Sequence, residues 1–375
     1  MSPMPASAPA HPARPEKPLF STADGRVDWV DVAKGVCIFF VVMMHATLGV
    51  QEITGEQSWM GSIVAWAAPF RMPDFFFIAG LFLMRTIDAP WLRFIDRKII
   101  HFVYFYLIWM VIQGVLKGGL LTGDPGAVPG VLLTALYEPF GTLWFIYILP
   151  IMFMVVRLTR QVPVWLMLVV TAALEIAPIT SGIFLLDEFC ARFVYFYAGY
   201  ALATHAFRMA DEARDKPLLA LVFLSSWAIV NTFAVFTPVE LLGETRTIAQ
   251  LPVVSLVMGG LGALAVISFA AVVTGGALGR LLSYMGARSI VIYLAFFVPM
   301  VIVREAGVRF GLITDTGLLS LVTTLAAVSL PLLGYWLIKT VKPLGIFAFL
   351  FERPQWARIE RDSSGRRRAA IAPAE

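Results

Sequence analysis

Ten stretches of this chain are long enough and apolar enough to cross a lipid bilayer as helices. A helix needs about 20 mostly apolar residues to do so. The composition agrees, since 59% of the 375 residues are hydrophobic and only 14% are charged, against about a quarter charged in a soluble domain. The stretches are 30–50, 61–84, 99–117, 141–158, 162–178, 185–206, 217–237, 250–274, 282–303 and 317–339. The sequence therefore predicts an all-α polytopic membrane protein with about ten transmembrane helices.

The charges between these stretches predict which way the helices run. Lys and Arg accumulate in cytoplasmic loops, and here they accumulate in every second connection, starting with the N-terminal segment. The intervening loops carry acidic residues and only a few Arg. Both termini are therefore expected in the cytoplasm. The pI of about 9.1 is explained by the basic residues of these loops, so it does not indicate a nucleic-acid-binding surface. We therefore expect the lipid bilayer as a partner and no nucleic acid.

The segments outside the apolar stretches divide the chain. Residues 1–28 are rich in Pro and Ala and have no apolar core, which predicts a disordered cytoplasmic tail. Residues 29–340 form the predicted transmembrane domain, and 341–375 a basic cytoplasmic tail. The segment 123–140 is predicted to be a loop, with or without a short interfacial helix. Both cysteines lie in apolar stretches and no metal-ligand spacing occurs, so neither a disulfide nor a metal site is expected.

The first stretch carries three ionisable side chains, which are costly in hydrocarbon and so mark candidate functional positions. Lys34 and His45 are eleven residues apart, which places them on one face of a helix, about 16 Å apart. Asp31 falls on the same face and can pair with Lys34 at i, i+3. Asp31 and Lys34 could equally be interfacial charges, and His45 a hydrogen-bond partner of another helix. Because a neutral imidazole is the usual general base near pH 7, we favour that role for His45.

The second stretch contains two charged residues in the sequence APFRMPDFFFIAG (68–80). Pro69 and Pro73 bracket Arg71, and Asp74 follows; a proline inside a helix removes a backbone hydrogen bond and bends the axis. One interpretation is a structural kink with an Arg71–Asp74 ion pair. The other is a helix break that lines a polar cavity and presents Arg71 to an anionic or carbonyl group.

Three later residues place polar groups near the ends of other stretches. Trp144 lies near the outer start of the fourth, Arg192 just inside the outer end of the sixth, and Arg288 at the inner side of the ninth. Each could be an interfacial anchor. Several stretches contribute a polar group, some near the outer side of the membrane and some near the inner side. We therefore favour a continuous polar pathway between the two sides.

Five short motifs stand in a fixed order between about residues 26 and 340. They are DVAKGVCIFFVVMMH (31–45), MPDFFFIAG (72–80), LWF (143–145), FYAGY (196–200) and SIVIYLAF (289–296). Together they resemble the acyltransferase-3 family of integral membrane acyltransferases. Two positions depart from the family pattern. Lys34 replaces the usual Arg and loses the planar fork that grips a carboxylate or phosphate at two points, and Phe296 stands where many relatives have His.

The resemblance implies a multi-pass enzyme of the bacterial inner membrane that O-acylates envelope polysaccharides. Cytoplasmic acyl-CoA, with acetyl-CoA expected, would be the co-substrate, without any bound cofactor, and a hydroxyl of an extracytoplasmic glycan or other envelope acceptor would receive the acyl group. His45 and Lys34 are the expected catalytic residues. The expected substrate- and donor-binding residues are Asp31, Arg71, Asp74, Trp144, Arg192, Arg288 and Tyr293. Of these, Asp31 would hold Lys34, and Asp74 would position Arg71.

Two other functions remain compatible with the residues alone. A proline-interrupted span with buried charges is also typical of transporters, so a transporter or flippase of an envelope precursor is the main alternative. The absence of a visible inverted repeat weighs against it. A non-catalytic membrane partner of an envelope assembly is the third possibility, and it predicts that His45 is dispensable.

Overall fold

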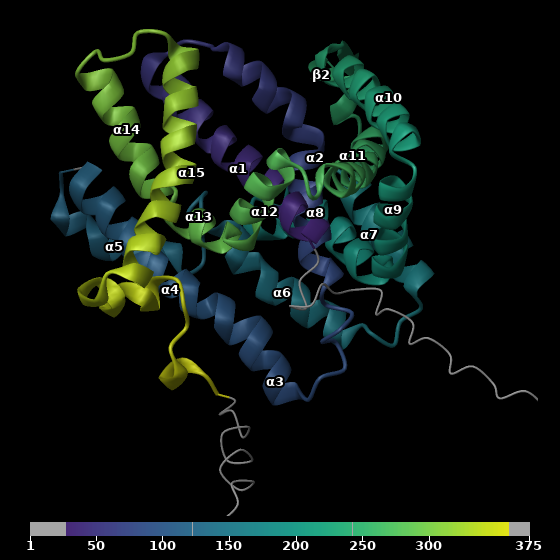
Figure 1. Cartoon of the computed structure of the whole chain (residues 1–375), viewed down its shortest axis with the longest axis horizontal. Coiled ribbons are helices and arrows are strands. Elements are labelled where there is room, and N and C mark those ends of the chain that lie inside the picture. Colours follow the sequence, from purple (N-terminus) through teal and green to yellow (C-terminus); the bar gives the residue numbers. More distant parts are fainter. Residues whose placement is uncertain (1–27, 122, 242, 360–375) are drawn as a thin grey trace, which may run out of the picture.

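The computed structural model describes residues 28–121, 123–241 and 243–359, and it is almost entirely helical (Figure 1). The helices of the first half are α1 (Asp28–Thr54), α2 (Trp59–Leu81), α3 (Trp91–Ile95), η1 (Asp96–Ile100), α4 (His101–Val115), η2 (Leu116–Leu121), η3 (Pro125–Ala127), α5 (Val128–Ala135), α6 (Trp144–Leu158) and α7 (Val164–Ile176). Those of the second half are α8 (Phe184–Ala201), α9 (Ala203–Asp215), α10 (Pro217–Phe236), η4 (Ile248–Gln250), α11 (Pro252–Val273), α12 (Ala277–Ala287), α13 (Ser289–Ala295), α14 (Phe297–Arg309), α15 (Thr316–Thr340), η5 (Lys342–Leu350) and η6 (Gln355–Ala357). The strands β1 (Pro238–Leu241) and β2 (Glu244–Thr247) pair antiparallel in one small hairpin. The prediction of an all-α membrane fold is confirmed.

Each of the ten apolar stretches contains a helix, but the helices differ in length. Within the described ranges, five helical segments are long and apolar enough to cross a membrane individually: Asp28–Thr54, Trp91–Gly119, Pro217–Phe236, Pro252–Val273 and Thr316–Thr340. The pair α13–α14 would make a sixth span, bent by 51°. The bend is expected because Pro299 cannot donate a backbone hydrogen bond to the carbonyl of Ala295. The short apolar helix α5 occupies the segment predicted as a loop with or without such a helix.

The helix α2 runs continuously through both of its prolines, Pro69 and Pro73. The predicted helix break in this stretch was therefore wrong. A proline removes only one intrahelical hydrogen bond, and α2 packs along α1, α8 and α11, so its neighbours hold the helical path across the two missing bonds. The consequence for the site is that Arg71 projects from a regular helix and not from an unwound segment.

Two helix crossings depend on glycines that belong to the sequence motifs. A Cβ on Gly35 of α1 would lie 2.8 Å from the carbonyl carbon of Leu282, and one on Gly286 would lie 2.7 Å from that of Asp31, so α1 and α12 touch backbone to backbone. Gly80 of α2 and Gly199 of α8 meet in the same reciprocal way. Close approach at small residues is a general means of packing helices in membranes.

The long central helix α1 lies between two groups of helices. It packs against α2, α11, α12 and α15, while α5, α14 and α15 lie to one side of it and α7, α9 and α10 to the other (Figure 1). Of its charged residues, Asp31 is buried and Lys34 is partly buried, whereas Asp28 and Glu52 near its two ends are exposed. Neighbouring helices thus enclose Asp31 and, in part, Lys34, and these two residues can belong to a site.

The first part of the predicted C-terminal tail is folded onto the helices. The hydroxyl of Tyr104 donates to the carbonyl of Phe349 at 3.0 Å, and Trp109 Nε1 donates to that of Leu350 at 2.9 Å. Arg353 Nη2 forms a buried ion pair with Asp96 Oδ2 at 2.7 Å. The N-terminal tail predicted over 1–28 lies, apart from its last residue, outside the described residues, as do 360–375.

Candidate active site

The N-terminal part of α1 carries the ion pair predicted from the sequence. Lys34 Nζ donates to Asp31 Oδ1 at 3.1 Å, and Nζ also lies 5.3 Å from the centre of the Phe82 ring. The Asp31 side chain is 11% exposed and that of Lys34 is 31% exposed. Asp31 therefore orients Lys34 while leaving part of the ammonium accessible.

Lys34 lines a mostly apolar cavity of about 220 Å³. Its walls come from α1, α2, α6 and α13, and a second cation, Lys98 of η1, lines it as well. Lys98 Nζ lies 4.7 Å from the centre of the Phe153 ring. Sequence reasoning missed Lys98 because it stands in a run of basic residues that a cytoplasmic loop explains equally well.

Tyr293 lies on the wall of the same cavity and is 5% exposed. Its ring lies 5.8 Å from that of Phe145 and 6.5 Å from that of Phe75. Its hydroxyl is buried and donates no hydrogen bond to any residue that the structure describes, while the backbone N–H groups of Phe145 and Ile146 at the start of α6 lie beside its oxygen. The hydroxyl proton can therefore be donated to a ligand that enters the cavity.

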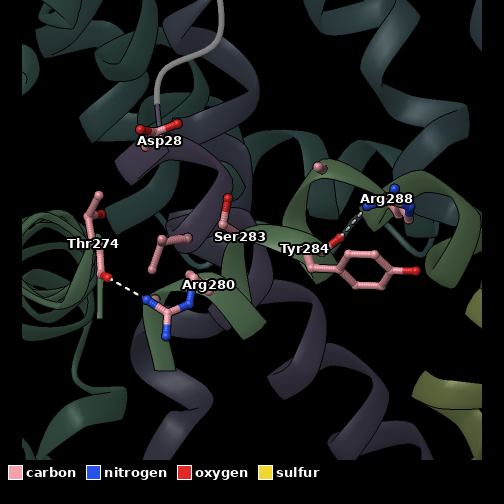
Figure 2. A pocket seen from close by; sticks show the side chains of 10 residues that line it. Asp28, Thr274, Arg280, Ser283, Tyr284 and Arg288 are labelled. Atoms are coloured by element: carbon pink, nitrogen blue, oxygen red, sulfur yellow. Dashed lines mark hydrogen bonds between the residues drawn. The ribbon is translucent and has the colours of Figure 1, made fainter. Parts of the chain in front are cut away.

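A second, more polar cavity of about 360 Å³ adjoins the inner end of α1 (Figure 2). Arg280 of α12, Arg288 directly after α12 and Asp28 of α1 are among the residues that line it. The Arg288 guanidinium lies 3.9 Å from the centre of the Tyr284 ring, and Nη1 donates to the Tyr284 carbonyl at 3.3 Å. The two cavities lie on either side of the α1–α12 crossing, since Val32 lines one and Lys34 the other.

His45 lies further along α1 and contacts the aromatic ring of Phe296, with 5.4 Å between ring centres. Within 28–121, 123–241 and 243–359, no group hydrogen-bonds its imidazole, so the alternative in which His45 bridges two helices finds no support there. Arg71 and Lys117 both interact electrostatically with His45. Both cations therefore contribute to the electrostatic surroundings of the imidazole, whose nitrogens have no hydrogen-bond partner among the described residues.

One helix connects the inner cavity to His45. Tyr293 lines the cavity and Phe296 contacts the imidazole, and these two rings lie 6.4 Å apart, three residues along the chain at the α13–α14 bend. The sequence departure at position 296 thus falls directly beside His45. A histidine in this place would bring a second imidazole against the first.

The predicted ion pair between Arg71 and Asp74 was wrong. The described residues contain no such pair, and Arg71 Nε and Nη1 and Asp74 Oδ1 are buried without hydrogen-bond partners among them. Asp74 is 2% exposed and interacts electrostatically with Cys37 and with Tyr195. The i, i+3 spacing alone therefore does not decide whether two charged side chains on a helix form a pair.

Arg192 lies on the same outer side as Arg71 and interacts with it electrostatically. Its Nε donates to Glu188 Oε2 at 3.2 Å, one helical turn away. The neighbouring Glu175 accepts hydrogen bonds from Ser255 at 2.7 Å and Tyr195 at 3.3 Å. Sequence reasoning brought Arg71 and Arg192 into one list but could not show that they face each other.

Trp144 begins α6 and packs among aromatic residues. Its ring lies 5.8 Å from the centres of both Phe76 and Phe184. These contacts account for its position by packing, so its role in substrate binding stays a prediction. Among the residues searched in the structure, there is no group of three or more His, Cys, Asp or Glu side chains that could hold a metal ion.

Two further cations near His45 were not anticipated. Lys117 Nζ lies 4.6 Å from the centre of the Phe140 ring and 5.0 Å from that of Phe297. Arg304 of α14 packs against Gly49, where a Cβ would lie 2.6 Å from Nη1. Gly49 is one helical turn beyond His45 on the same face. In the sequence both cations stand at or directly after the end of a predicted apolar stretch, 99–117 or 282–303, where a loop charge is the ordinary explanation.

Comparison with known proteins decides the family. The family model described as an acyltransferase domain, of the acyltransferase-3 type, matches residues 27–339. The chain belongs to this acyltransferase family. Inner membrane protein YcfT of Escherichia coli (strain K12) is 35% identical to the enzyme over 81 residues, which cover 19% of this chain and 23% of that protein. No solved structure matches the chain. The predicted resemblance is confirmed, and the apolar helices fit a membrane protein of this family.

Proposed function

We propose that this enzyme moves an acyl group, with acetyl expected, from cytoplasmic acyl-CoA to a hydroxyl of an extracytoplasmic glycan or similar envelope acceptor. The observation that carries the proposal is the arrangement along α1. Lys34 lines an inner cavity, His45 lies about 16 Å further out along the helix, and Tyr293 and Phe296 connect the two. Such a path suits a donor and an acceptor that arrive from opposite sides.

The proposed topology has ten spans, with both termini in the cytoplasm of a bacterium and the spans in its inner membrane. The alternation of basic and acidic connections supports it, as does the presence of a helix in each of the ten stretches. The similarity to an inner membrane protein agrees with this location. In this topology both cavities next to the start of α1 open toward the cytoplasm, and His45 lies in the outer half.

The inner cavities have the chemistry that an acyl-CoA donor requires. Arg280 and Arg288 could neutralise the nucleotide phosphates, because guanidinium groups match phosphate geometry. The narrow apolar cavity would take the pantetheine arm, with Lys34 and Lys98 beside it. An extended pantetheine arm can bridge the distance from Lys34 to His45, so the thioester would reach the imidazole.

The transfer itself is a single acyl exchange. The acceptor oxygen attacks the thioester carbon, its proton passes to the imidazole of His45, and the C–S bond breaks to release CoA, whose thiolate recovers the proton. Arg71 would stabilise the developing oxyanion electrostatically. The unpaired hydroxyl of Tyr293 is a second donor that could serve the same oxygen.

The decisive experiment substitutes His45 and follows radiolabelled acetyl-CoA in isolated membranes. A general base contributes roughly 10²–10⁴-fold in rate, so His45→Gln should lose most transfer while the protein level stays unchanged. His205→Gln is the matched control, because His205 is exposed on α9. Full activity in His45→Gln would refute the role of the imidazole. Wild-type membranes that transfer no label to any envelope fraction would refute acyl transfer from acetyl-CoA.

A further inference from the structure

Four cationic side chains from four helical elements contribute to the surroundings of His45. Lys117 Nζ of η2 lies 5.0 Å from the centre of the Phe297 ring, and the ring of the preceding residue, Phe296, lies 5.4 Å from the imidazole. Arg71 of α2 and Lys117 both influence His45 electrostatically, as Arg192 of α8 influences Arg71. Arg304 of α14 lies one turn further out, against Gly49. Because these residues are separated by up to 233 positions in the chain (304 − 71), only the packing of the helices brings them together.

This cluster is only partly neutralised by protein groups. Arg192 pairs with Glu188 at 3.2 Å and Arg304 with Glu305 at 3.1 Å. Arg71 and Lys117, in contrast, have no acidic partner within 4 Å in the described segments, and Arg71 Nε and Nη1 are buried without a hydrogen bond there.

Gathering positive charge away from water is costly unless a negative charge joins it. Arg71 is not held in place by Asp74, and it is not fully exposed to solvent. Aromatic rings on two sides of Lys117 stabilise its ammonium, but they do not cancel its charge.

The transient oxyanion of acyl transfer does not account for the cluster. It carries a single negative charge, and one or two donors are enough to stabilise it. Arg71 and Lys117, which have no acidic partner, together with the paired Arg192 and Arg304, provide more positive charge than one oxyanion requires. The excess is the expected arrangement for a ligand group that is negatively charged throughout the reaction.

We propose that Arg71 and Lys117, supported by Arg192 and Arg304, form an anion-binding site beside His45 that takes a carboxylate or phosphate group. Given the proposed function, on which this assignment of the group rests, the anion belongs to one of two sources. It is an acidic group of the acceptor, such as a uronic acid or a phosphorylated sugar, or the free carboxylate of a dicarboxylic acyl chain.

Anion binding can be tested without any assay of transfer. The purified protein in detergent is unfolded thermally with glucuronate, inorganic phosphate or neutral glucose at constant ionic strength. An anion that binds the folded state raises the unfolding midpoint. We expect glucuronate or phosphate, but not glucose, to raise the midpoint of the wild type, and Arg71→Gln to lose that shift while Arg71→Lys keeps part of it.

Two control variants locate the binding. Arg208→Gln removes an exposed cation of α9, and Arg280→Gln removes one from the polar inner cavity; both should keep the shift. No shift with either anion, or a shift that survives in Arg71→Gln and disappears in Arg280→Gln, would overturn the proposal. This assay measures anion binding and not acyl transfer. Anion binding can therefore be found even if the protein transfers no acyl group, and acyl transfer can be found even if no anion binds.

The source of the anion follows from comparing donors. If the acyl chain carries it, Lys117→Gln should lower CoA release from succinyl-CoA at least tenfold and leave release from acetyl-CoA nearly unchanged. If the acceptor carries it, release from both donors in the absence of acceptor should be unchanged, while transfer of acetyl groups to acidic glycans falls at least tenfold. Unchanged rates in every arm would overturn the site as a part of the reaction.

Discussion

The crossing of α2 and α8 predicts that one methyl group at Gly199 destabilises the protein. A Cβ built on Gly199 would lie 2.8 Å from the carbonyl carbon and 3.0 Å from the Cα of Phe77, and closer still to its carbonyl oxygen. Carbon atoms in ordinary contact are about 3.5–4.0 Å apart. Because the obstructing atoms are backbone, no side chain can rotate away, and Gly199→Ala must push one helix from the other.

The expected cost combines two opposing effects. Forced overpacking costs about 1–3 kcal/mol, and replacing a helical Gly by Ala returns up to about 1 kcal/mol. We therefore expect Gly199→Ala to lose stability by roughly 1–2 kcal/mol. Activity should fall as well, since the two helices that separate carry Arg71 and Arg192.

The assay is thermal unfolding of the purified protein in detergent, with Gly260→Ala as the matched control. Gly260 lies inside α11, and a Cβ there would meet no atom within 4 Å, so only the gain in helix propensity of up to about 1 kcal/mol remains. The two variants should shift the midpoint in opposite directions. If Gly199→Ala unfolds at or above the wild-type temperature, the close crossing is not what packs α2 on α8.

Three further predictions concern the inner side of the enzyme. Lys34→Ala should abolish acyl transfer and Lys34→Arg retain part of it, because a guanidinium keeps the charge and adds bidentate contacts; equal rates in both variants and the wild type would reduce Lys34 to an interfacial anchor. A reporter active only in the periplasm should give signal when fused after residue 130 and none when fused after residue 212, and the reverse pattern would overturn the orientation. Asp96→Ala should cost about 3–5 kcal/mol in unfolding free energy by leaving the buried Arg353 unpaired, and an Asp96→Ala/Arg353→Met double variant should recover much of it.

Some of the site follows from the sequence because the relevant interactions are local. Lys34 and Asp31 are paired as the i, i+3 spacing requires, since both belong to one regular helix. The placement of Lys34 and His45 on one face of α1 follows from the same geometry. The motif order identified the family, although the physical role of two motif glycines, Gly80 and Gly199, appears only at the helix crossing.

The sequence failed where neighbouring helices decide the outcome. Arg71 and Asp74 have the spacing of an ion pair, yet they form none, and buried polar atoms of both side chains have no hydrogen-bond partner among the described residues. Lys117 and Arg304 look like loop charges in the sequence, yet both lie near the face of α1 that carries His45.

The sequence by itself determined the helices and their membrane character. A backbone in lipid must satisfy its hydrogen bonds within each segment, and the apolar stretches of the sequence indicate which segments lie in lipid. It also determined which ionisable residues stand inside apolar stretches. Only the tertiary structure decided which of these residues meet. The reason is that helix packing is set by shape, by glycine contacts such as Gly35 with Gly286, and by the competition among several neighbours for each buried charge.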